Sequence, residues 1–131
     1  MNKKGLKILL IDDTVIVLQH LQKLLSELKQ VGSTEAVQSA EEALRLMDDF
    51  LPDIMVLDIN MPGMSGIEML KQLSMKQSTR PVIIMLTNNA FAGYRDECLR
   101  LGADYFLDKS RDFQMIPSIV EQVQQHKVVS M

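Results

Sequence analysis

Four short segments of the chain are apolar almost without interruption, and they restrict its possible folds more than any other feature. They are Leu6–Ile11, Ile54–Leu57, Val82–Leu86 and Tyr105–Leu107. A strand with one face in solvent alternates apolar and polar residues, whereas a parallel strand covered by helices on both faces is apolar throughout. A weaker strand is expected around Ser33–Val37. The pattern predicts a parallel sheet between two layers of helices.

Segments with helical periodicity separate these expected strands. Apolar residues recur at helical spacing in five places: Leu18, Leu21, Leu25 and Leu28; Ala40, Ala43, Leu44 and Met47; Ile67, Leu70 and Leu73; Phe91, Tyr94, Cys98 and Leu101; and Ile116, Ile119, Val120 and Val123. Ser39 with Glu42 and Ser65 with Glu68 match the capping box of a helix start, and Gly102 stands where a C-terminal cap is expected.

Strand and helix therefore alternate five times along the chain. This order predicts an α/β fold, doubly wound (βα)5, with a five-stranded parallel sheet and right-handed crossovers. We expect residues 1–131 to form a single domain with a core of about residues 5–126.

Composition excludes several classes of protein. A net charge of −3 and a pI near 5.3 argue against a nucleic-acid partner. The single cysteine, Cys98, excludes an internal disulfide framework and fits a reducing compartment. The apolar run that begins at Leu6 is ended by Asp12 and Asp13, which is too early for a signal peptide, and no segment is long enough for membrane insertion. We expect a cytoplasmic protein.

Polar residues gather at the ends of the expected strands. Asp12 and Asp13 follow the first strand, Asp58 the third, Thr87 the fourth and Lys109 the fifth. Ligands of open α/β sheets bind beyond the carboxyl ends of the strands, where the strand order reverses. If the first and third strands are neighbours there, three carboxylates meet and require a cation, for which Mg²⁺ is suited because it takes oxygen ligands. With a lysine and a hydroxyl added, the set matches a phosphoryl-transfer site.

The motifs resemble those of the CheY-like receiver domains of response regulators. The matching runs are Ile8 to Asp13, Pro52 to Gly66, Val82 to Thr87 and Gly102 to Lys109, in the same order as in that family. The resemblance extends from about Leu6 to His126 and implies the flavodoxin-like strand order 2-1-3-4-5. It also implies a phospho-acceptor in a two-component system, a signalling switch rather than an enzyme, with Mg²⁺-dependent self-catalysed phosphoryl transfer and slow autodephosphorylation.

The resemblance assigns a role to each strand-end residue. Asp58 would accept the phosphoryl group from a histidine kinase or a histidine phosphotransfer protein, and Lys109 would pair with that group. The metal ligands would be the carboxylates of Asp13 and Asp58, the backbone carbonyl of Asn60, and Asp12 largely through water.

The same resemblance predicts how the signal leaves the site. Thr87 would turn towards the phosphoryl group and Phe106 would move inward, reshaping the face made by the fourth helix, fifth strand and fifth helix. A downstream protein, which the sequence does not identify, would bind that face. No DNA-binding segment follows Val123, so we expect no output domain in this chain.

Three positions depart from the pattern of the family. Asn88 stands where a small residue is common, Phe106 lacks the hydroxyl of the frequent tyrosine, and Ser110 replaces the usual proline after the lysine. A cis bond before a residue other than proline costs roughly 3–4 kcal/mol. We therefore expect the Lys109–Ser110 bond to be trans.

Each site residue also has a simpler interpretation. An acidic pair before a helix often only complements the helix dipole, a lone lysine is usually solvated, and Asn60 is typical of a turn. The pairs Glu41-Glu42 and Asp48-Asp49 are most simply a solvated helix face. The strand-end set favours a ligand site because its members fall together at one edge of the expected sheet.

Three other functions remain to be weighed. A phosphatase-like hydrolase with an aspartyl nucleophile would carry Asp-x-Asp-x-Thr/Val after the first strand, which Ile11-Asp12-Asp13-Thr14 does not match. A flavin-binding electron carrier would need a phosphate loop rich in Ser, Thr and Gly at Asp12-Asp13-Thr14. A scaffold that binds partners without phosphorylation is disfavoured because the acidic residues, threonine and lysine are all present.

Overall fold

Strands and helices alternate along the whole of the chain that the computed structural model describes, which is residues 5–76, 80–88 and 92–129. The elements are β1 Leu6–Ile11, α1 Val15–Ser26, β2 Val31–Val37, α2 Ala40–Phe50, β3 Ile54–Leu57, α3 Gly66–Ser74, β4 Val82–Thr87, α4 Ala92–Arg100, β5 Tyr105–Asp108, a short 3₁₀ turn Phe113–Met115, and α5 Ile116–Val129. The weak strand prediction around Ser33 is confirmed as β2, which begins two residues earlier, at Val31. Phe91, expected in the fourth helix, lies outside the described residues.

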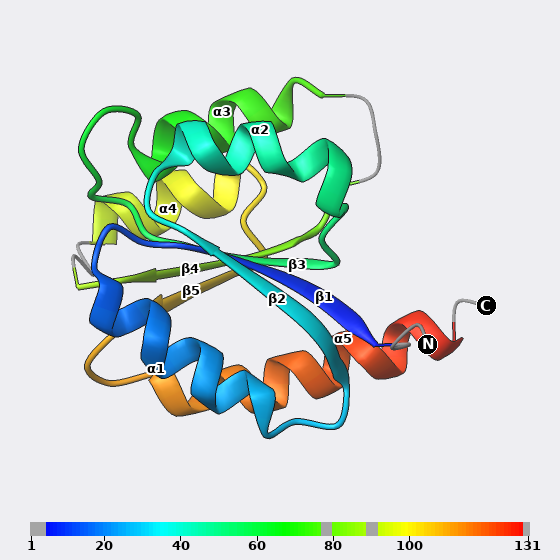
Figure 1. The fold of residues 1–131 in the computed structure, drawn as a ribbon. Helices are drawn as coiled ribbons and strands as arrows, with labels where there is room; N and C mark the ends of the chain where they lie inside the picture. The colour runs from blue at the N-terminus through cyan, green and yellow to red at the C-terminus, as the bar shows by residue number, and fades with distance from the viewer. Residues whose placement is uncertain (1–4, 77–79, 89–91, 130–131) are drawn as a thin grey trace.

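The five strands form one parallel sheet in the order β2-β1-β3-β4-β5, as predicted. Helices α2, α3 and α4 cover one face of the sheet, and α1 and α5 cover the other (Figure 1). Successive residues of a strand point to opposite faces, so Leu9 and Ile11 pack beneath α2–α4 while Ile8 and Leu10 pack against α1 and α5. Burial on both faces explains why the strand sequences are continuously apolar.

Capping explains where two of the helices begin. Ser65 accepts a hydrogen bond from the Glu68 N–H, and the Glu68 carboxylate accepts one from the Ser65 N–H, so the predicted capping box is complete in α3. At α2 only half of the expected box forms. Ser39 accepts a hydrogen bond from the Glu42 N–H, but the Glu42 carboxylate accepts one from the Ser39 hydroxyl and not from the Ser39 N–H.

Gly102 ends α4 as predicted. Its φ of +108° lies in the region that favours glycine. Its N–H donates to the Leu99 carbonyl and the Ala103 N–H donates to the Cys98 carbonyl, which is the Schellman arrangement. The chain then turns directly into β5, which ends at the edge of the sheet where β1 and β3 also end (Figure 1).

Candidate functional site

Backbone hydrogen bonds carry the strand pairing one residue past the carboxyl ends of the strands. In each case a site residue donates its N–H to the last residue of a neighbouring strand: Asp12 to Val37 (3.2 Å), Asp58 to Ile11 (3.0 Å) and Lys109 to Thr87 (3.0 Å). These bonds extend the regular sheet, so the backbone of the first residue of each loop is fixed by the sheet. The side chains predicted from the sequence therefore converge at one edge of the sheet.

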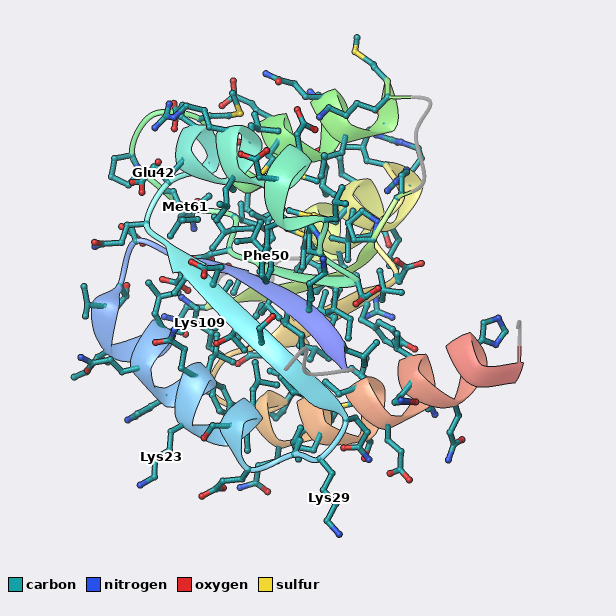
Figure 2. All side chains as sticks on the ribbon, turned by 45° about the vertical axis from the view of Figure 1, so that its right-hand side comes forward. Lys23, Lys29, Glu42, Phe50, Met61 and Lys109 are labelled. Carbon is teal, nitrogen blue, oxygen red and sulfur yellow. The ribbon has the colours of Figure 1, made fainter. Side chains whose placement is uncertain are left out.

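Lys109 is the cation of this cluster. Its ammonium lies 2.6 Å from Asp12 Oδ2 and 3.1 Å from Asp58 Oδ2. The lysine side chain is 10% exposed, and those of Asp12 and Asp58 are 3% and 7% exposed. Figure 2 shows Lys23 and Lys29 pointing away from the molecule, whereas Lys109 lies within the outline of the fold. Lys109 is thus a largely buried bridge between two carboxylates, rather than the solvated charge of the simpler interpretation.

Each of the two bridged carboxylates is oriented by a backbone amide as well. Asp12 Oδ1 accepts a hydrogen bond from the Thr14 N–H at 2.9 Å, and Asp58 Oδ1 accepts one from the Ile59 N–H at 2.8 Å. One oxygen of each group is therefore held by the backbone and the other by the lysine. This double hold fixes the plane of both carboxylates.

Asp13 completes an acidic pocket. Carboxylate oxygens of Asp12, Asp13 and Asp58 lie within 4.8 Å of one another, with Asp13 exposed and the other two buried. Three hard oxygen donors at this spacing fit a divalent cation such as Mg²⁺, which takes a few carboxylates and keeps several waters. Asn60, the remaining predicted ligand, is exposed in the loop that follows Asp58.

The electrostatics of Asp58 are set by opposing effects. Burial raises the pKa of the Asp58 carboxyl, and the nearby negative charge of Asp12 adds to this, while Lys109 and the Thr87 hydroxyl lower it, with the net shift upward. For Lys109, burial lowers the pKa, but the hydrogen bonds and charges of Asp12 and Asp58 outweigh it and raise the pKa. The lysine therefore stays charged, and Asp58 is ionised at a cost.

The two predicted switch residues lie on neighbouring strands. Thr87 is 1% exposed at the end of β4. Phe106 pairs in register with Met85 and is partly buried against the core beneath α2–α4, which includes Cys98. Thr87 thus interacts with Asp58 at the pocket, and Phe106 packs against the core that includes Cys98 of α4.

The loop between β3 and α3 is held from two sides. A Cβ on Gly66 would collide with the Asp58 carbonyl oxygen, so only glycine lets α3 begin this close to Asp58. Glu41, from α2, accepts a hydrogen bond from the Met64 N–H at 3.1 Å. The interpretation of Glu41 as part of a solvated helix face was therefore wrong, because helical periodicity does not reveal a contact with a distant loop.

The peptide bond between Lys109 and Ser110 is trans, as predicted, since the described residues contain no cis bond. Sequence reasoning missed the role of the preceding residue. The Asp108 carboxylate accepts hydrogen bonds from the Ser110 N–H, the Ser110 hydroxyl and the Arg111 N–H. The signal was present as an aspartate two residues before a serine, a spacing typical of turns in which a side chain binds the backbone.

The fold and the acidic pocket together define an α/β domain with a ligand site at the switch point of its sheet. The family model for the response regulator receiver domain matches residues 8–121. The chain therefore belongs to the response regulator receiver domain family, as the sequence motifs indicated.

Individual relatives agree with this assignment. The chain is 32% identical over 111 residues to the two-component response regulator PhoP of Pseudomonas aeruginosa, covering 83% of this chain and 47% of PhoP. It is 37% identical over 83 residues to the transcriptional regulatory protein YdfI of Bacillus subtilis, covering 63% of this chain and 38% of YdfI. The chain thus spans less than half the length of these relatives.

Solved structures resemble the fold closely. The receiver domain of the Francisella response regulator 1452 superposes with a TM-score of 0.82 at 27% identity, covering 94% of this chain and 99% of that one. The response regulator domain of Thermotoga maritima CheB gives a TM-score of 0.78 at 26% identity, covering 92% of this chain and 95% of that one.

Among the described helices, none is long and apolar enough to cross a membrane.

The raised pKa of Asp58 leads to a prediction about stability. Without metal at neutral pH, Asp58→Asn should raise the free energy of unfolding by on the order of 1 kcal/mol, the usual size of a single-residue effect, because it removes a buried negative charge next to Asp12. The folded-state pKa lies above the unfolded value, so the cost of the ionised group is relieved as the pH falls through the folded pKa. The advantage of the variant should shrink as the pH is lowered.

Urea unfolding of the wild type and of Asp58→Asn, in EDTA and at a series of pH values from neutral downwards, measures the effect. Glu35→Gln, which removes an exposed carboxylate from β2, is the matched control and should change little. A variant that is less stable than the wild type at neutral pH would contradict this account of the pocket.

Proposed function

We propose that this chain is a phosphorylation-dependent signalling switch in which Asp58 is the phospho-acceptor. The observation that carries the proposal is a buried aspartate at the carboxyl end of β3, bound by Lys109 and adjoined by two further carboxylates. The donor would be a histidine kinase or a histidine phosphotransfer protein. A partner of this class is supported by the similarity to PhoP, which is a two-component response regulator.

The chemistry proposed is a single displacement at phosphorus. An oxygen of the Asp58 carboxylate forms a bond to the phosphorus of a phosphohistidine, and the bond from phosphorus to the imidazole nitrogen breaks. The imidazole leaves with its electron pair and takes up a proton, and the product is an acyl phosphate on Asp58. Lys109 lies within 3.1 Å of Asp58 Oδ2, near enough to pair with a phosphoryl oxygen there.

Mg²⁺ is the proposed cofactor, and it would neutralise charge on the phosphoryl oxygens. Asp13 and Asp58 would hold it directly, Asn60 through its backbone carbonyl, and Asp12 largely through water. Asp13 is the exposed member of the three carboxylates, which supports a direct role for it. The three carboxylates would repel one another less with the ion present.

We further propose that the chain acts as a switch rather than as an enzyme, since the phosphoryl group ends on its own side chain and is lost only by slow autodephosphorylation. The receiver core would extend over about residues 5–126. A cytoplasmic location is proposed from the single free cysteine and the intracellular nature of the proposed donors.

The proposal predicts one metal-dependent phosphorylation. After incubation with acetyl phosphate and Mg²⁺, intact mass spectrometry should show one phosphoryl adduct on the wild type and none on Asp58→Asn. Excess EDTA should abolish the adduct, and Asp13→Ala should slow its formation roughly tenfold or more, the scale of losing a metal-site partner. Asp49→Asn, an exposed carboxylate on α2, is the control and should react like the wild type. An adduct that persists on Asp58→Asn or in EDTA would contradict the assignment of Asp58 as a metal-dependent phospho-acceptor.

The output surface is proposed to be the face of α4, β5 and α5, where a downstream protein would bind. Support comes from the places of Thr87 and Phe106 on the neighbouring strands β4 and β5, with Phe106 packed against the core that includes Met85 of β4 and Cys98 of α4. Coupling requires an element with two arrangements, and the proposal assigns that part to Phe106, which is partly buried against the core.

Backbone NMR tests this surface. Beryllofluoride imitates a bound phosphoryl group. Added together with Mg²⁺, it should shift the amide signals of α4, β5 and the first half of α5, including those of residues far from the ligand. Asp58→Asn should show no such changes. Shifts confined to the loops around Asp12, Asp58 and Lys109 would count against an output through this face.

A further inference from the structure

The loop that follows β5 is closed by hydrogen bonds that meet on Asp108. Asp108 Oδ1 accepts from the Ser110 N–H at 2.8 Å, from the Ser110 hydroxyl at 2.6 Å and from the Arg111 N–H at 3.2 Å. The Asp108 N–H donates to Asp112 Oδ2 at 2.9 Å, and the Asp112 N–H donates to the Asp108 carbonyl at 2.8 Å. These bonds join the residues on both sides of Lys109.

Lys109 is consequently fixed at its backbone as well as at its ammonium. Its N–H donates to the Thr87 carbonyl at 3.0 Å, and its ammonium reaches Asp12 and Asp58. A lysine side chain has many rotamers, so its ammonium occupies one place only if the backbone beneath it points in a constant direction. A turn closed by a carboxylate supplies that constancy.

We propose that Asp108 and Ser110 are positioning residues that direct Lys109 towards Asp58 and thereby set the rate of phosphoryl transfer. The inference rests on the proposed function of Asp58 and Lys109. The ion pairs of Lys109 among the described residues are with Asp12 and Asp58, so Asp108 acts on the lysine through the backbone of the turn.

The turn is suited to hold this geometry throughout the neutral pH range. Hydrogen bonds from the Ser110 hydroxyl and N–H lower the pKa of the Asp108 carboxyl, so it remains an acceptor at neutral pH. The Ser110 side chain is exposed, so its replacement should change the turn without removing buried apolar contacts.

The test is the rate of phosphorylation by acetyl phosphate at saturating Mg²⁺. Asp108→Ala should lower the rate roughly tenfold, because it removes several hydrogen bonds of the turn. Ser110→Ala removes one hydrogen bond and should lower the rate roughly threefold. Ser110→Thr keeps the hydroxyl and should retain the wild-type rate. Ser74→Ala is the matched control, because the Ser74 hydroxyl donates at 2.7 Å to a backbone carbonyl on a distant exposed helix end.

A second measurement separates positioning from general stability. In a Lys109→Ala background, Asp108→Ala and Ser110→Ala should slow phosphorylation no further, because they act through the lysine. An added loss in that background would show a merely structural role and overturn the inference. Circular dichroism checks folding, and if Asp108→Ala does not fold, the comparison of Ser110→Ala with Ser110→Thr decides.

The outcomes also distinguish this inference from the function on which it rests. Suppose that Lys109→Ala is phosphorylated slowly while Asp108→Ala and Ser110→Ala are phosphorylated at the wild-type rate. The positioning role is then wrong and the proposed function stands. If the wild type takes up no phosphoryl group on Asp58, the proposed function itself fails.

Discussion

The contact of Lys109 with Asp12 and Asp58 is the interaction on which the arrangement of the pocket depends. Burying carboxylates costs free energy unless a counter-charge and hydrogen bonds compensate it. The lysine supplies the charge, and the Thr14 and Ile59 amides supply the hydrogen bonds. The compensation is incomplete, because the pKa of Asp58 remains raised. The pocket therefore retains a tendency to gain positive charge, which fits a site for a divalent cation.

The parallel sheet makes this contact possible. Every strand of such a sheet ends at the same edge, and the N–H groups of Asp12, Asp58 and Lys109 continue the pairing one residue beyond it. Residues that are far apart in the sequence are thus placed by the same hydrogen bonds that hold the sheet together. Loops need little length to build such a site, and the turn on Asp108 holds the last member in place.

The fold and the members of the pocket could be predicted from the sequence because both follow from local patterns. Continuous apolar runs located β1, β3, β4 and β5, and polar residues after those runs located Asp12, Asp58 and Lys109. The β2 strand was harder, since its exposed edge residues break the apolar pattern. The contacts of a helix face with a distant loop could not be predicted, as Glu41 on the Met64 N–H illustrates, because helical periodicity does not record which loop a helix will meet.

The central claim is that phosphoryl chemistry takes place on Asp58 itself, and mapping the modified residue tests it most directly. The protein is incubated with acetyl phosphate and Mg²⁺, treated with borohydride, which reduces an acyl phosphate to an alcohol, and digested for peptide sequencing by mass spectrometry. The account predicts homoserine at position 58, with Asp12, Asp13 and Asp53 unchanged. Homoserine at any of those three positions, with Asp58 intact, would contradict it.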